Sequence, residues 1–423
     1  NVYIVDKDTL EIWGDVLYYD GNTRIAAMSG GVLMKDPQLT LTTDTLIYDL
    51  GLNTANYLEG GRIIDSENEL TSLWGFYYAD FHEFFFKDEV VLTNPDYVMR
   101  SDTLKYNTET EVSYFYGPTS IIGEKDRIYC KNGWYDTKND IAQFNKDAYL
   151  TNHEQSLTGD SVYYDRNIGY GKAIQNVVLT DSVNQTFITG HFAEHFDKEG
   201  LSYVTNNAVL TIIYENDSLF LHADTLKSIY HEDTDSRTLL AFRKAKFYRS
   251  DLQGLSDSIA YHTADSTIYM YYDPIIWAEE NQMTAVRIEI KSDGESVKSV
   301  HLFESSFSIS MLDSLSFDQI KGRNMVGHFL EGVLKRIEVF GNGETIYNLT
   351  DEGSKKVNAI NKAICSDIVI YIEDNAVNRI KFIDRPDATL YPPKELPQEE
   401  RFLKNFKWHA EKRPKSKQDI FTW

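Results

Sequence analysis

The chain has little of what defines several common protein classes. Its 423 residues include only two cysteines and nine prolines, and no run of 18 apolar residues occurs. Two isolated cysteines provide neither a disulfide framework nor a zinc pattern. Without a long apolar run, no segment is expected to cross a membrane as a helix.

Net positive charge is also absent. The chain has 65 Asp and Glu against 42 Lys and Arg, a formal net charge of −23. This balance excludes a nucleic-acid binder that depends on phosphate neutralisation. The chain begins at Asn1 without a targeting segment, so we interpret it as a mature or trimmed fragment. Tyrosine (28) and phenylalanine (22) are abundant, and this composition favours strands over helices.

A six-residue phrase recurs along the chain. Its best copies are Asp44–Asp49, Asp102–Asn107 and Asp160–Asp165. Further copies begin at 224 and 257, and looser copies at 15, 75, 132 and 190. Successive starts are 29, 31, 27, 30, 28, 30, 34 and 33 residues apart. A second phrase, a small polar residue followed by alternating apolar residues, lies midway, as in Gly30–Met34. Two phrases in phase indicate a repeat of about thirty residues.

Each phrase alternates with period two, which predicts strands. Leu46 and Tyr48 would share one face, and Ile47 and Asp49 the other. Turns rich in Gly, Asn and Asp, such as Asp20–Asn22, separate the phrases and predict antiparallel pairing. A repeat therefore holds two crossings, each a strand or a bent pair of strands. Such units have to stack to bury an apolar face, which predicts an elongated all-β array.

The array implies a length. Each repeat adds about 9.6 Å at the roughly 4.8 Å strand spacing, so a body ending near residue 390 would be on the order of 100–125 Å long. Cys130 and Cys365 are 235 residues apart in sequence, or on the order of 75 Å along this array. We expect both to be free thiols, because this distance is far beyond disulfide reach.

The C-terminal part is less regular. Alternation continues in Val286–Ile290 and Leu334–Val339, and Gly341–Gly343 predicts a hairpin turn. Residues 353–364 are the strongest helix candidate, with Ser354 as N-cap. Strands are predicted again at Ile368–Ile372 and Arg379–Ile383.

A basic tail follows. Residues 391–423 hold eight Lys or Arg and five Asp or Glu, a net +3. We expect this tail to be extended or helical and docked by Phe402, Phe406 and Trp408, with a partly disordered terminus as the alternative. The predicted organisation is a repeat region at 1–280, a less regular β region at 281–390 and a tail at 391–423.

Motifs for catalysis or metal binding are weak. His191-Phe192-Ala193-Glu194-His195 matches a zinc-protease pattern that needs a helix. On the strand predicted here, residues four apart would be about 13 Å apart and could not share one zinc. The recurring Asp44, Asp102, Asp160, Asp224 and Asp257 are interpreted as strand-start or turn residues. We predict no enzyme, cofactor or metal site.

One face of the array is the candidate binding site. If the two crossings of each repeat do not close fully, the shared apolar face becomes a groove for a long, linear, apolar ligand such as a fatty-acyl chain. A packed core is the equally weighted alternative. The predicted lining is Val32, Leu46, Tyr48, Val90, Leu104, Tyr106, Val162, Tyr164, Val177, Leu226 and Ile259.

The repeat phrases resemble those of the OstA-like family of lipopolysaccharide-transport proteins, whose members include the periplasmic LptA type and the periplasmic part of the outer-membrane translocon. The resemblance covers about residues 1–280 and includes Thr43–Asp49 with Asn53–Gly60, and Gly159–Asp165 with Gly169–Val177. Long members of the family also resemble this chain at Lys321–Met325, Gly341–Tyr347, Leu403–Trp408 and Arg413-Pro414.

The resemblance implies an open, V-shaped antiparallel β-jellyroll in the periplasm that holds the acyl chains of lipopolysaccharide. It also implies partners among lipopolysaccharide-transport proteins, or further copies of the chain, joined head to tail by their end strands. A groove for this anionic lipid would need basic residues at its mouth, with Lys172, Arg243, Lys244 and Lys246 as candidates. Two alternatives remain: a closed, adhesive β-solenoid that binds protein or glycan, and a groove-based carbohydrate enzyme with paired carboxylates.

Overall fold

The computed structural model describes residues 2–6, 10–35, 37, 39–65, 67–152, 155–183, 185–215, 217–293, 296–350, 356–373 and 376–423. In these ranges no helix has the length and apolar character to span a membrane. The chain divides into two compact units, unit 1 (Asn1–Lys198) and unit 2 (Glu199–Trp423). The boundaries at 280 and 390 that the sequence suggests stay predictions.

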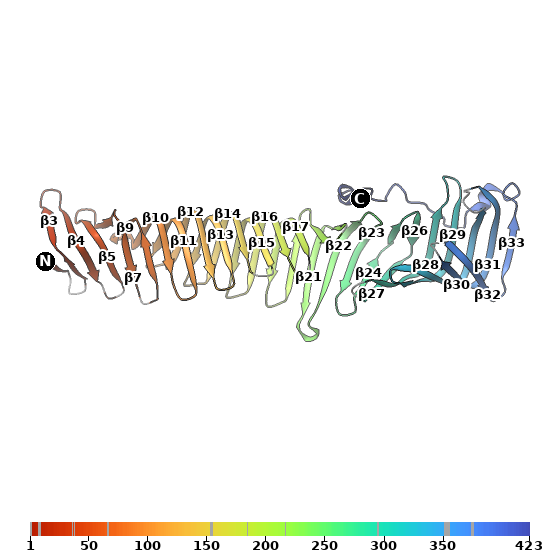
Figure 1. Ribbon diagram of the computed structural model, residues 1–423, viewed down its shortest axis with the longest axis horizontal. Coiled ribbons are helices and arrows are strands. Elements are labelled where there is room, and N and C mark those ends of the chain that lie inside the picture. Colours follow the sequence, from red (N-terminus) through yellow and green to blue (C-terminus); the bar gives the residue numbers. More distant parts are fainter. Residues whose placement is uncertain are drawn as a thin grey trace. The chain divides into compact units, whose positions relative to one another are not determined.

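Unit 1 is a row of antiparallel strands joined by tight turns (Figure 1, red to yellow-green). Its elements are β1 (Val2–Asp6), β2 (Leu10–Gly14), β3 (Val16–Asp20), β4 (Ile25–Lys35), β5 (Thr40–Asp49), β6 (Thr54–Tyr57), β7 (Gly61–Ile64), β8 (Glu69–Ser72), β9 (Trp74–Tyr78), η1 (Ala79–Phe81), β10 (Glu83–Thr93), β11 (Tyr97–Asn107), β12 (Val112–Gly123), β13 (Arg127–Asp136), β14 (Ile141–Thr151), β15 (Gln155–Asp165), β16 (Tyr170–Asp181) and β17 (Thr186–Phe196).

Unit 2 is also antiparallel and, like unit 1, contains short 3₁₀ turns. Its elements are β18 (Leu201–Thr205), β19 (Val209–Ile213), β20 (Ser218–His222), β21 (Thr225–His231), η2 (Glu232–Thr234), β22 (Ser236–Tyr248), β23 (Leu252–His262), β24 (Thr267–Tyr271), β25 (Ile275–Ala278), β26 (Asn281–Thr284), β27 (Arg287–Ser292), β28 (Val297–Met311), β29 (Phe317–Leu330), β30 (Val333–Thr350), β31 (Val357–Glu373), β32 (Ala376–Ile383), β33 (Asp387–Tyr391), η3 (Gln398–Arg401) and η4 (Lys417–Phe421).

A bend in the middle of each long strand creates two arms. In β14 the pairing register shifts where Lys146 (φ 58°) and Asp147 (φ 60°) adopt the left-handed conformation, and in β16 Gln175 (φ 56°) and Asn176 (φ 50°) do the same. Two such residues in succession turn the strand sharply. We call arm A the half-strands that carry Leu46, Leu104 and Val162, and arm B those that carry Val32, Val90 and Val177. A thirty-residue repeat is therefore two bent strands, which confirms the all-β, repetitive fold.

The core lies between the two arms. Near the N-terminus, Met28 and Leu46 of arm A and Val32 and Leu41 of arm B belong to one buried cluster. The Tyr57 ring also lies against the backbone of Gly61, where an added Cβ would be 2.4 Å from the ring. Side chains of one arm thus fill the space left by small residues of the other.

The C-terminal segment packs against unit 2 as predicted. Phe402, Phe406 and Trp408 contact a buried cluster that includes Phe307, Ile309 and Ile346. This cluster lies on the outer face of arm B. Along β28, Phe307 and Ile309 alternate with Ser308, which belongs to the inner face. Ser308 pairs with Met283, and Met283 pairs with Ile276 of that same face. Both faces of arm B are therefore buried in unit 2.

Three local predictions are wrong. Residues 357–364 form the start of strand β31 and not a helix, while residues 353–355 lie outside the described residues. Gly341-Asn342-Gly343 is the bend inside β30 and not a hairpin turn. The recurring Asp44, Asp102, Asp160 and Asp257 lie at bends within strands and not at strand starts, whereas Asp224 directly precedes β21.

Candidate functional site

The inner face of unit 1 consists of rows of side chains that run across the strands. Two rows lie next to the bend, one on each arm, and we call them the proximal rows. Leu104, Phe115, Gly133, Phe144 and Val162 are successive Cα partners in the proximal row of arm A. The four apolar side chains among them are at most 4% exposed. The predicted residues Val32, Leu46, Val90, Leu104, Val162 and Val177 all lie in the proximal rows and are at most 3% exposed.

A third row lies farther from the bend on arm A, and we call it the distal aromatic row. Large and small residues alternate along most of it, because the tyrosine of the repeated phrase pairs with a small residue of the next strand; Phe84, between Tyr77 and Tyr106, is the exception. Its members, paired in order, are Tyr19, Ala26, Tyr48, Ala55, Tyr77, Phe84, Tyr106, Ser113, Tyr135, Ala142, Tyr164, Gly171 and His195. The predicted Tyr48, Tyr106 and Tyr164 all belong to this row.

Two tyrosine hydroxyls of the distal aromatic row donate to residues at the turns. The Tyr48 hydroxyl donates to Asn53 Oδ1 (2.6 Å), and the Tyr135 hydroxyl donates to Asp140 Oδ1 (2.8 Å). Burial, followed by this hydrogen bond, raises the pKa of Tyr135 to about 12. Burial also raises the pKa of Tyr106. The rings therefore face the apolar interior while their polar ends lie at its edge.

A fourth row, the distal aliphatic row, lies on arm B and escaped the sequence prediction. It is unbroken from β1 to β17, and at about 4.8 Å per strand it extends for on the order of 60 Å. Its signal was the second apolar position of the midway phrase, two residues beyond Val32, Val90 and Val177. The row contains Ile4, Ile12, Met34, Leu41, Ile63, Leu70, Leu92, Met99, Ile121, Ile128, Leu150, Leu157, Leu179 and Ile188.

Exposure increases with distance from the bend in the last four strands of unit 1. Val162 of the proximal row is 2% exposed, whereas Tyr164 of the distal row, two residues on, is 38% exposed. On arm B, Val177 is 1% exposed and Leu179 is half-buried. The apolar surface that solvent reaches therefore lies on the distal rows.

The two predicted residues of unit 2 share a single row. Leu226 pairs with Ala241, which pairs with Ile259, and both predicted residues are at most 7% exposed. Farther along, side chains of this arm fill the space above glycines of the other: a Cβ added to Gly322 would be 2.3 Å from Val339 Cγ1. The inner face of unit 2 is packed tightly here.

None of the proposed basic residues lies at an edge of the inner face. Lys172 is on the outer face of arm A, between Tyr163 and Glu194. Arg243 (φ 63°) and Lys244 (φ 53°) form the bend of β22. Lys246 is only 5% exposed and donates to the Thr422 carbonyl. Carboxylates at the turns instead accept backbone N–H groups, as Asp49 does from Gly51 and Leu52 at 2.7 and 3.0 Å.

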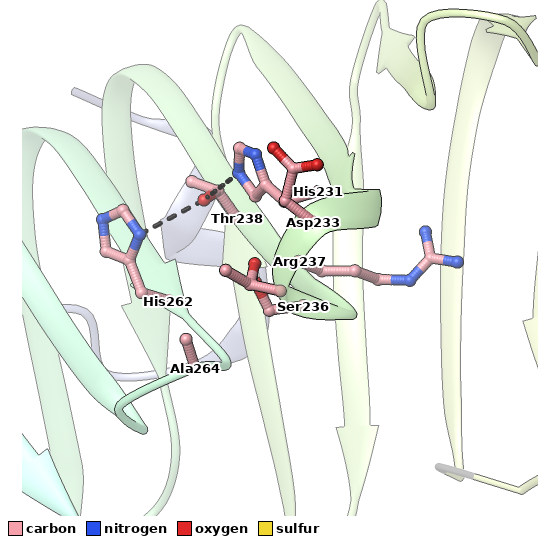
Figure 2. A pocket seen from close by; sticks show the side chains of 8 residues that line it. His231, Asp233, Ser236, Arg237, Thr238, His262 and Ala264 are labelled. Carbon is pink, nitrogen blue, oxygen red and sulfur yellow. Dashed lines mark hydrogen bonds between the residues drawn. The ribbon is translucent and has the colours of Figure 1, made fainter.

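The hairpin of η2 borders a cavity in unit 2 (Figure 2). Its volume is about 390 Å³, and Thr238 stands between two histidines, with Oγ1 2.9 Å from His231 Nε2 and 3.2 Å from His262 Nδ1. Asp233 is the one carboxylate in its lining. A second cavity, of about 610 Å³, is lined by Tyr271, Arg287 and Arg323 among others, with Glu304 as its one carboxylate. Neither lining holds the carboxylate pair of a glycosidase.

The two histidines of the zinc-protease pattern and the two cysteines all lie in strands. His191 and His195 lie on β17, a strand as predicted, and within the described ranges no three His, Cys, Asp or Glu side chains form a group suited to a metal. Cys130 and Cys365 are buried free thiols. Burial raises the pKa of Cys130 to about 11, so this thiol is neutral and unreactive near pH 7.

Comparison with known protein families gives a match for the N-terminal part of unit 1. Residues 1–102 and 98–160 match the family model of OstA-like proteins, together 160 of the 423 residues. Over these residues the chain is similar to OstA-like proteins. The match confirms the resemblance that the repeat phrases suggest, and it covers arms A and B from β1 to the middle of β15.

No curated protein is significantly similar to the chain. Among solved structures, the chain is similar to LptH from Pseudomonas aeruginosa, described as the LptA-homologous periplasmic component of the lipopolysaccharide transport device. The sequence identity is 13% and the TM-score is 0.24, and the similarity covers 25% of this chain and 81% of that one.

Proposed function

We propose that unit 1 binds the acyl chains of lipopolysaccharide between its distal rows and passes the lipid along the array toward the outer membrane. The observation that supports this proposal is the unbroken distal aliphatic row facing the distal aromatic row. Each methylene group moved from water to an apolar surface contributes about 0.8 kcal/mol. A surface that is continuous from strand to strand also offers a sliding lipid no polar barrier.

In this proposal, the proximal and distal rows of the predicted lining have different roles. The proximal residues, such as Leu104 and Val162, form the packed floor, and the ligand contacts the distal residues, such as Tyr164 and Leu157. The phosphate groups of the lipid then remain in water beyond the turns. Since the carboxylates at the turns and the phosphates are both negatively charged, divalent cations would bridge them.

The proposed location is the periplasm, and the proposed partners are other lipopolysaccharide-transport proteins. Among the described residues, β1 pairs with β2 and β3 pairs with β4, each along one edge. Their other edges present backbone N–H and C=O groups to which the end strand of a partner or a second copy can pair. We propose no enzymatic activity.

A matched pair of tyrosines tests the proposal. Tyr164 (38% exposed) lies on the inner face, and Tyr149 (40% exposed) lies on the outer face, since it alternates with the buried Ala148. With a photo-crosslinking amino acid at each position, we expect lipopolysaccharide to be labelled from position 164 and not from 149. Equal labelling from both, or none from either, would contradict the proposal, and the second result would favour the closed solenoid.

A further inference from the structure

Buried glutamines line the outer face of arm B in unit 2. Gln253, Trp277, Gln282, Ile309 and Gln319 are successive Cα partners across β23, β25, β26, β28 and β29. Each is at most 2% exposed. A buried amide is costly unless its hydrogen bonds are made, so the partners of these three glutamines define what the face is built to hold.

Gln319 and Gln282 bind the C-terminal segment in the same way. Gln319 Nε2 donates to the Arg401 carbonyl (2.8 Å), and its Oε1 accepts from the Leu403 N–H (2.8 Å). Gln282 Nε2 donates to the Lys407 carbonyl (2.8 Å), and its Oε1 accepts from the His409 N–H (2.7 Å). Each amide thus pairs with the C=O of one residue and the N–H two residues later, as the backbone of a neighbouring strand would.

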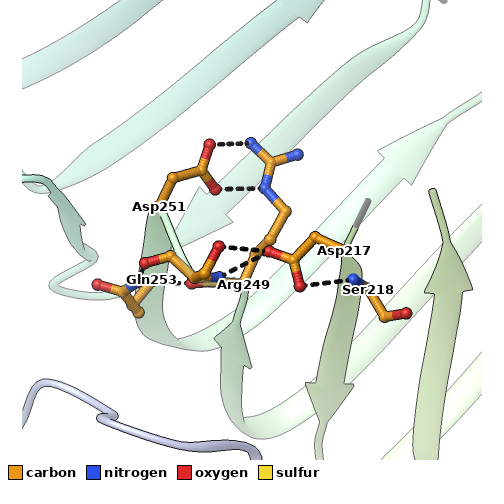
Figure 3. Close-up of polar contacts among 6 residues, drawn as sticks. Asp217, Ser218, Arg249, Asp251 and Gln253 are labelled. Atoms are coloured by element: carbon orange, nitrogen blue, oxygen red, sulfur yellow. Dashed lines mark hydrogen bonds and ion pairs between the residues drawn. The ribbon is translucent and has the colours of Figure 1, made fainter. Parts of the chain in front are cut away.

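Gln253 makes the third contact through a side chain. Its Nε2 donates to the carbonyls of Arg249 (2.5 Å) and Ser250 (3.0 Å), which fixes the amide in its own turn (Figure 3). Its Oε1 accepts from Arg413 Nε (2.7 Å), and Arg413 also donates to the Glu279 carbonyl (2.7 Å).

The contacts reveal a six-residue period in the segment. Gln319 contacts Arg401, Gln282 contacts Lys407 and Gln253 contacts Arg413. These three basic residues are spaced six apart, and each precedes a ring: Phe402, Trp408 and Pro414. Phe402 and Trp408 pack on the apolar cluster, and Pro414 is buried. The glutamines are two strands apart, or about 9.6 Å. One hexad of the segment therefore matches one thirty-residue repeat of the sheet.

We propose that the outer face of arm B from β23 to β29 is a peptide-binding surface, whose ligand is a polypeptide that makes a turn within each hexad and carries a basic residue and a ring repeated every six residues. Its occupant is the chain's own segment, residues 395–423, held noncovalently and in a fixed register. Two side-chain amides recognise the peptide backbone, and the rings set the register. This inference goes beyond lipid binding and does not depend on it.

The test separates the segment from its surface in the full chain. A protease site inserted between Lys394 and Glu395, both exposed, allows cleavage after folding. We expect fragment 395–423 to stay with the body in gel filtration and to exchange with a fluorescent synthetic peptide of the same sequence, followed by anisotropy. Loss of the fragment together with no binding of the synthetic peptide would overturn the proposal.

Peptide variants test the register without altering the body. One glycine inserted between Phe406 and Lys407 moves the second and third hexads out of phase with Gln282 and Gln253. We expect this peptide to bind at least tenfold more weakly, and the Lys404→Ala peptide, altered at an exposed position, to bind within twofold of the native one. Equal binding of the native and glycine-inserted peptides would refute a fixed register.

A body variant tests the amide directly. Gln282→Leu keeps the side-chain size but removes both backbone contacts, and we expect the cleaved fragment to dissociate at least tenfold faster. Gln155→Leu, at an exposed position in unit 1, is the control and should leave dissociation unchanged. Unchanged dissociation in the Gln282→Leu protein would show that the rings alone hold the segment, contrary to the proposal.

Discussion

Replacing Phe115 with alanine tests whether the proximal rows are a packed floor. Phe115 is 0% exposed, lies against Phe144 with ring centroids 6.4 Å apart, and fills the space beside Gly133. Truncation of a buried phenylalanine costs about 3–5 kcal/mol of unfolding free energy. The adjacent Tyr116 is 41% exposed on the outer face, so Tyr116→Ala should cost about 0.5 kcal/mol or less.

Urea unfolding followed by circular dichroism measures the difference between the two variants. At a typical slope of about 1–3 kcal/mol per molar urea, a loss of 3 kcal/mol lowers the midpoint by about 1–3 M. Since each repeat contacts only its neighbours, hydrogen exchange should accelerate in β10–β14 and not in β4 or β5. A cost below about 1 kcal/mol for Phe115→Ala, equal to that of Tyr116→Ala, would mean that the proximal rows are not closely packed and would refute the floor.

Three further predictions concern single residues. The Cys130 thiol should react with a disulfide reagent at pH 8 only after unfolding. Because its pKa is raised from 9.0 to about 11 in the folded chain, its contribution to stability is constant below pH 9 and is lost as the pH rises from 9 toward 11. The Cys130→Ala variant should lack this pH-dependent loss of stability. Tyr135→Phe removes the hydrogen bond to Asp140 and should lower the free energy of unfolding by about 0.5–1.5 kcal/mol, whereas Tyr149→Phe on the outer face should not. Gln175→Val forces a β-branched residue into the left-handed conformation at a bend and should cost about 1–3 kcal/mol in thermal unfolding, while Gln175→Gly should be neutral or stabilising.

Much of the fold of unit 1 is predictable from the repeat because both phrases repeat with the strands. The alternation of Leu46 and Tyr48 with Ile47 and Asp49 indicates which residues share a face, and pairing across strands then places the predicted residues in common rows. The bend itself is harder to predict. It is made by pairs such as Lys146-Asp147 and Gln175-Asn176, whose left-handed conformation has no single residue type as its signal.

The wrong helix prediction at 353–364 has a physical cause. Val357, Ile360 and Ala363 have the spacing of a helix although they lie in strand β31. In the structure, Ile360 belongs to the outer cluster covered by the C-terminal segment and Ala363 pairs with Thr345 on the inner face. A strand buried on both faces loses its period-two pattern. The distal aliphatic row was missed for another reason: alternation shows that Leu179 faces inward but not how far from the bend it lies.

The bent-strand pair is also a unit of sequence length. Because every row is continued by the next pair, a duplication or deletion of one whole pair with its turns leaves each remaining side chain on its original face. Insertions or deletions within a turn change only the length of that turn, which accounts for copies that differ by a few residues in spacing. A change of one residue inside an arm would instead reverse all side chains between it and the next bend. Duplication of whole pairs is thus a genetic route by which the array can lengthen by about 9.6 Å at a time without redesign of its inner face.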